Sequence, residues 1–103
     1  MTLRLVEFLR ARLTEDAERQ KNPLTAWHGR DCESVPDVLY PDREPGACDC
    51  GIPERLLAEV EAKRRMVEES WGGPDHEDMW EHHLRLLALP YVGHEDYIEE
   101  WRP

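Results

Sequence analysis

The feature that most constrains the fold is a long stretch, from Pro23 to Gly51, that has neither helical nor strand periodicity. Four prolines and three glycines interrupt it, and both residue types break regular structure. Val38-Leu39-Tyr40 is its only strand-like run and is too short to define a strand. A segment of this length without regular structure is unusual inside a compact domain. We therefore expect either a mobile loop or a segment that some further interaction orders.

Helical patterns flank this stretch on both sides. Apolar residues recur at three- and four-residue steps, which predicts a first helix over Leu3 to Lys21 and a central helix over Pro53 to Trp71. A third helix is predicted over Glu77 to Leu89 and a short last one over Glu95 to Trp101. The sequence thus predicts an all-α fold, a small three-helix bundle plus a short C-terminal helix, with residues 23–51 as a long irregular insertion.

Length and charge narrow the class of protein. The 103 residues suffice for a single helical domain, 1–103, with a modest core. The net charge of −10 would repel a nucleic-acid backbone, so we expect no direct nucleic-acid binding. The same charge suits a protein partner that carries a basic patch. The sequence shows neither a membrane-spanning apolar run nor a signal-peptide pattern, and we therefore expect a cytoplasmic protein without membrane binding.

The sharpest chemical pattern lies inside the irregular stretch. His28-x₃-Cys32 is followed, after 15 intervening residues, by Cys48-x-Cys50. Zinc prefers four Cys and His ligands in a tetrahedron, supplied as two short half-sites joined by a loop. The pattern predicts a structural Zn²⁺ site formed by these four residues, and a bound ion would order the segment. The alternative is that the three cysteines are free thiols without a metal, as is common in cytosolic proteins.

Two other histidines could complete such a site. His76 or His82 could supply the fourth ligand in place of His28, if the helix hairpin brought either of them back to the thiols. Asp78 and His82 are also one helical turn apart, so they could share a divalent ion. A solvated acidic helix start is the better interpretation of that cluster.

Trp27 directly precedes the first candidate ligand. A tryptophan at this place is either buried against the metal or the helix ends, or it is an exposed anchor for a protein partner. Both alternatives stay open from the sequence, and Trp27 is our candidate partner-binding residue.

Three blocks of the sequence resemble a known family. They are LVEFLRARLTEDA (Leu5 to Ala17), ERLLAEVEAKRRMVEES (Glu54 to Ser70) and LRLLALPYVGHEDYIEEWRP (Leu84 to Pro103). Together they resemble an uncharacterised family of small proteins from high-GC Gram-positive bacteria and their phages, domain of unknown function 6221. The resemblance implies a cytoplasmic accessory protein, encoded by a bacterium or a phage. It implies no activity and no catalytic residue.

These observations yield hypotheses about function rather than an activity. The first is a small acidic interaction or regulatory protein with a structural zinc site. The second is an acidic decoy that occupies a nucleic-acid-binding surface of another protein. The third, and the weakest, is a metal-dependent enzyme that uses Asp78 and His82. The sequence shows neither a nucleophile constellation nor a phosphate-binding glycine loop, so an enzyme is not the favoured interpretation.

Overall fold

The computed structural model describes residues 2–69 and 77–103, and its regular structure in these ranges is all helical, with no strand. Helix α1 spans Thr2–Lys21, α2 spans Ile52–Glu69 and α3 spans Glu77–Ala88. Two 3₁₀ turns follow, η2 over Leu89–Tyr91 and η3 over Glu99–Trp101. The predicted all-α class and the three predicted helices are thereby confirmed for the described part of the chain.

The start of α2 shows how local sequence sets a helix boundary. Gly51 has a φ of 71°, a left-handed conformation that glycine adopts without steric cost. Its carbonyl accepts the N–H of Arg55 at 3.0 Å, which closes the first turn. Pro53 lies within that turn, where its missing N–H costs no hydrogen bond. The predicted end of this helix at Trp71 lies outside the described residues.

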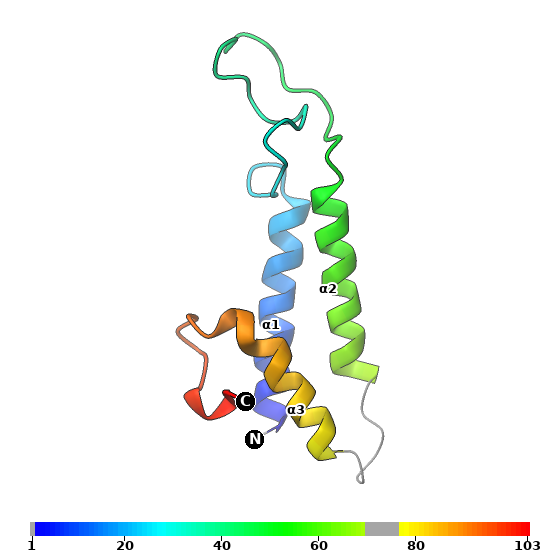
Figure 1. Ribbon diagram of the computed structural model, residues 1–103, viewed down its shortest axis with the longest axis vertical. Helices are drawn as coiled ribbons and strands as arrows, with labels where there is room; N and C mark the ends of the chain where they lie inside the picture. Colours follow the sequence, from blue (N-terminus) through cyan, green and yellow to red (C-terminus); the bar gives the residue numbers. More distant parts are fainter. Residues whose placement is uncertain (1, 70–76) are drawn as a thin grey trace.

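The helices pack around α1. In Figure 1, α1 and α2 run side by side in opposite directions, and α3 crosses the N-terminal half of α1. Between α1 and α2, Arg10 and Glu68 form a bidentate ion pair with N–O distances of 2.5 and 2.7 Å. The C-terminal arm returns to the start of α1, so the two chain ends lie close together.

The core is apolar and lies where the helices meet. It is built from side chains of all three helices and of the C-terminal arm: Leu5, Val6, Phe8, Leu9, Leu13, Ala17, Val60, Val67, Leu84, Ala88 and Trp101. Leu5, Val6, Leu9 and Leu13, the recurring apolar residues of the first helix, are therefore buried. No helix in the described ranges has the length and apolar character needed to cross a membrane.

The C-terminal segment differs from its prediction. A helix over Glu95 to Trp101 is expected from the sequence, but only the single 3₁₀ turn η3 forms, and Ile98 before it is extended, with φ −101° and ψ 126°. The reason is aromatic packing. The Phe8 ring meets the rings of Tyr97 and Trp101 at centroid distances of 6.1 and 5.0 Å, and these contacts decide the path of so short a segment.

Residues 22–51 contain turns but neither helix nor strand, as predicted for the irregular insertion. This segment projects beyond the ends of α1 and α2 (Figure 1), and the whole molecule measures 59 × 26 × 17 Å. One limb of the segment leaves the end of α1, and the other limb leads into the start of α2. Whatever ties the limbs together therefore lies directly above the helix pair.

Candidate metal centre

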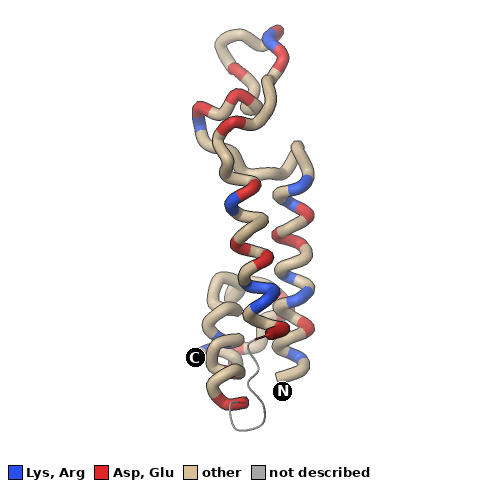
Figure 2. Tube along the Cα trace, turned by 90° about the vertical axis from the view of Figure 1, so that its right-hand side faces the viewer, with Lys and Arg blue, Asp and Glu red and all other residues tan. Residues whose placement is uncertain are grey.

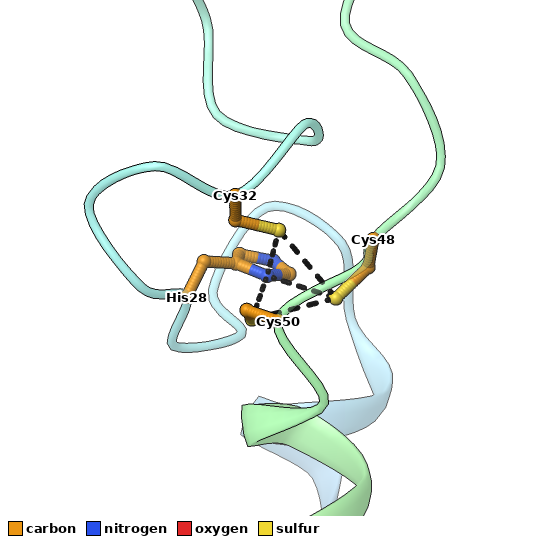
Figure 3. A group of neighbouring side chains, drawn as sticks. All are labelled: His28, Cys32, Cys48 and Cys50. Carbon is orange, nitrogen blue, oxygen red and sulfur yellow. Dashed lines mark hydrogen bonds between the residues drawn. The ribbon is translucent and has the colours of Figure 1, made fainter.

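Four side chains converge at the base of the projecting segment (Figure 3). They are His28, Cys32, Cys48 and Cys50, and one ligand atom from each lies within 4.8 Å of the others. The His28 Nδ1 atom lies 3.6, 3.3 and 3.7 Å from the sulfurs of Cys32, Cys48 and Cys50, in that order. The Cys48 sulfur lies 3.7 Å from that of Cys32 and 3.6 Å from that of Cys50.

These distances match the edges of a tetrahedron around a metal ion. With zinc–sulfur and zinc–nitrogen bonds of about 2.3 and 2.0 Å, the ligand atoms of a tetrahedral site lie about 3.8 Å apart for two sulfurs and about 3.5 Å apart for sulfur and nitrogen. A disulfide needs a sulfur–sulfur distance of about 2.0 Å, and all three cysteines are free. The group of four can therefore hold one metal ion.

Local turns place the ligands. The N–H of Cys32 donates to the Gly29 carbonyl at 3.0 Å, and this turn brings Cys32 to within hydrogen-bond range of His28. Residues two apart in an extended chain face the same side, so Cys48 and Cys50 can present both sulfurs together. Gly51 then begins α2 immediately after the last ligand.

Two backbone contacts of Glu33 join the limbs next to the ligands. Its N–H donates to Asp49 Oδ1 at 2.9 Å, and its carbonyl accepts the N–H of Gly46 at 2.8 Å. The N–H of Glu33 also lowers the pKa of the Asp49 carboxyl group, which keeps this acceptor charged. The segment is thus closed by hydrogen bonds as well as by the four converging side chains.

The surroundings of the sulfurs favour thiolates at two of the three positions. Burial raises the pKa of the Cys32 thiol, but hydrogen bonds from the Ser34 hydroxyl and from backbone groups outweigh it and bring that pKa to about 6. Backbone hydrogen bonds from Gly29 and Ile52 lower the pKa of Cys50. Burial raises the pKa of Cys48. Since thiolates are the forms that bind metal, the site is partly prepared for a cation.

Ser34 is a residue of the site that the sequence pattern does not single out. Its Oγ lies 3.0 Å from the Cys32 sulfur and 3.1 Å from His28 Nδ1. A hydroxyl group there can donate to a metal-bound thiolate, as groups around metal ligands commonly do. The only signal in the sequence is its position two residues after Cys32, which many serines share.

The other predicted site residues are not part of this group of four. His82 and Asp78 are exposed on α3, at the end of the molecule opposite the four ligands (Figure 1), so the structure does not bring His82 to the thiols. His76 lies outside the described residues. Trp27 is 55% exposed and its ring lies 5.8 Å from the Arg19 guanidinium carbon. Trp27 is therefore not buried against the ligands or the helix ends.

The chain matches a protein family over nearly its whole length. A family model described as a family of unknown function, DUF6221, matches residues 2–103. Neither the curated proteins nor the solved structures contain a significant match to this chain.

Proposed function

The chain belongs to this family of unknown function. We propose that it is a non-enzymatic interaction protein in which a structural zinc ion holds the irregular segment together. His28, Cys32, Cys48 and Cys50 would be the ligands. The single observation behind the proposal is their convergence, with every ligand atom within 4.8 Å of the others. Three thiolates and an imidazole are a donor set that suits zinc.

The number of ligands favours a structural rather than a catalytic role. Four protein side chains fill a tetrahedral site, whereas catalytic zinc sites have three protein ligands and an open position for water or substrate. A closed site holds two limbs of the chain together. Zinc binding would then contribute directly to the folding of a segment that has almost no apolar core of its own.

The distribution of charge supports an interaction role better than a nucleic-acid decoy. Basic and acidic residues alternate along α1 and α2 (Figure 2), and several of them pair within α2, as Arg55 does with Glu59 and Arg65 with Glu61. A decoy would need a row of carboxylates at phosphate-like intervals. Exposed Trp27, which directly precedes His28 in the sequence, is the proposed anchor for a partner, because large rigid aromatic side chains often dominate binding energy.

The proposal is tested by metal analysis of protein purified without chelator. Elemental analysis and native mass spectrometry should find about one zinc per chain. Replacing zinc by cobalt(II) should give the visible absorption of a tetrahedral thiolate complex. Protein that contains no metal, and takes up neither zinc nor cobalt on reconstitution, would refute the zinc staple.

Two histidine variants form a matched pair for this test. His28→Ala should weaken zinc binding by at least about tenfold, since it removes one of four ligands. His82→Ala should leave zinc binding unchanged, because His82 lies on α3. If His82→Ala weakened binding instead, the ligand set proposed above would be wrong.

A further inference from the structure

The projecting segment exposes a continuous run of apolar side chains. Val38, Leu39 and Tyr40 are 90%, 80% and 66% exposed. Single exposed apolar residues are normal on a protein surface. Three consecutive exposed apolar residues at the tip of a projection instead indicate an interaction site, because exposed apolar patches commonly mark such sites. They also contribute nothing to the core.

The segment is hollowed on the side next to this run. The concave surface is lined by apolar side chains, among them Val35, Val38 and Leu39, and by Pro36 and Pro45. An occupant could therefore place an apolar side chain in the hollow. The hollow lies within the segment itself and is separate from the interface between the helices.

The charge of the side chains that line the hollow indicates what kind of partner segment would bind there. Between Arg30 and Gly46 the chain has five acidic residues and two arginines, and acidic residues lie along both limbs of the segment (Figure 2). Asp31, Glu33, Asp37 and Glu44 all line the hollow. Arg43 is paired with Glu33 at 3.5 Å, so the remaining carboxylates exceed the cations there. A basic occupant is electrostatically complementary to this surface.

The hollow is held in shape from within. The N–H of Arg43 donates to the Tyr40 carbonyl at 3.0 Å, and the N–H of Leu39 donates to Asp37 Oδ1 at 2.9 Å. At its base lie the four converging ligands and the contacts of Glu33. A recognition loop that is ordered before binding loses less entropy when a partner docks.

We propose that the tip and hollow of this segment bind a basic, apolar peptide segment of a partner protein, with Lys or Arg flanking a Leu, Ile or Phe. The apolar side chain would enter the hollow beside Val35, Val38 and Leu39, and the flanking cations would meet Asp37 and Glu44. Because the proposed zinc staple would hold the base of this loop, the docking site rests on the proposed function and names its partner.

The test uses the zinc-loaded, full-length protein as bait for a phage-displayed library of random peptides. Enriched peptides should carry Lys or Arg next to an apolar residue, and they are then synthesised as the probe. Binding of this probe should fall at least about tenfold in Val38→Ser/Leu39→Ser/Tyr40→Ser, because central apolar contacts dominate affinity. This variant alters only exposed side chains and should fold normally.

Charge is tested separately, with a matched control. Asp37→Asn/Asp42→Asn/Glu44→Gln should also weaken binding, and Asn at position 37 keeps the Oδ1 acceptor for Leu39. The control Glu18→Gln/Glu69→Gln/Glu100→Gln changes the net charge equally at exposed positions on the helices and the C-terminal arm. If the two charge variants weaken binding equally, binding depends only on net charge and the proposed docking site is refuted.

Other outcomes also decide the question. No enriched peptide, or equal binding to the serine variant, overturns the docking site. So does binding of neutral phosphatidylcholine vesicles that depends on the apolar tip, since the occupant would then be lipid. Zinc content is measured on every sample. Zinc-containing protein that binds no peptide overturns the docking site alone, whereas protein without zinc overturns the staple.

Discussion

The Cys32 thiol shows how neighbouring dipoles act on one residue. Burial alone would raise its pKa above the ordinary value of 9.0, yet hydrogen bonds bring it to about 6. The largest of the lowering contributions comes from the Ser34 hydroxyl. We predict that Ser34→Ala raises the pKa of Cys32 in metal-free protein. The measurement is the pH dependence of iodoacetamide alkylation, followed for each cysteine by peptide mass spectrometry, because only the thiolate reacts.

The sign of the effect follows from the direction of the shift. With its pKa lowered to about 6, the Cys32 thiol is expected to be mostly ionised below pH 9, where an ordinary thiol is mostly protonated. The variant should therefore react more slowly than the wild type in this range and equally fast above it. The pKa of Cys50 should change less than that of Cys32, because the largest contributions that lower it come from backbone hydrogen bonds of Gly29 and Ile52. An unchanged midpoint for Cys32 would remove Ser34 from the site.

Gly51 gives a second prediction for a single residue. A Cβ at this position meets no atom within 4 Å, so the cost of Gly51→Ala comes only from the positive φ of 71°. We expect the free energy of unfolding to fall by about 1 kcal/mol, measured by urea denaturation. Gly93→Ala is the control, since its Cβ is also unobstructed and its φ is not positive. Equal effects at both positions would mean that φ is not the cause.

Among the elements, α1 is the one on which the others pack. Leu9 is fully buried in the shared core, whereas Leu3 on the same helix is 67% exposed. We predict that Leu9→Ala lowers the free energy of unfolding by about 2–5 kcal/mol through lost burial and the cavity it leaves. Leu3→Ala should change it by less than about 0.5 kcal/mol. Thermal and urea unfolding of both variants measure this difference, and similar losses would show that α1 is not packed as described.

The helices could be predicted because their residues obey local rules. The apolar spacing on α1, and Gly51 and Pro53 at the start of α2, each specify a helix or its boundary without reference to the rest of the chain. The C-terminal arm could not be predicted in the same way. Its path depends on the Phe8 ring, which is distant in sequence and which draws Tyr97 and Trp101 toward α1.

In the candidate site, too, some features follow from the local sequence and others depend on the folded chain. The spacing of His28, Cys32 and the Cys48/Cys50 pair was enough to predict their convergence, because few residue types bind zinc and their half-sites are short. Ser34 could not be predicted from spacing, since its role depends on where one hydroxyl points. The exposure of Trp27 likewise cannot be predicted from the sequence, because burial depends on the course of a segment that has no regular structure.

At the scale of the whole molecule, two parts are stabilised by different interactions. The helices share an apolar core. The projecting segment keeps Val38, Leu39 and Tyr40 exposed; hydrogen bonds join its limbs, and the four candidate ligands lie at its base. If these ligands bind zinc, removing the ion should loosen the segment and spare the helices, because parts of one protein can open separately.

Trypsin can measure this separation, because Arg30 and Arg43 lie in the segment and are exposed. We predict that a zinc chelator accelerates cleavage after these two residues by at least about tenfold, while helical circular dichroism changes little. Cys48→Ser is the control: it should be cleaved fast with or without chelator. Chelator-independent cleavage of the wild type would mean that hydrogen bonds such as Glu33 to Asp49 suffice to close the segment. Loss of helical signal would mean instead that the apolar core alone cannot hold α1 and α2 together, and that the two helices also need the zinc staple.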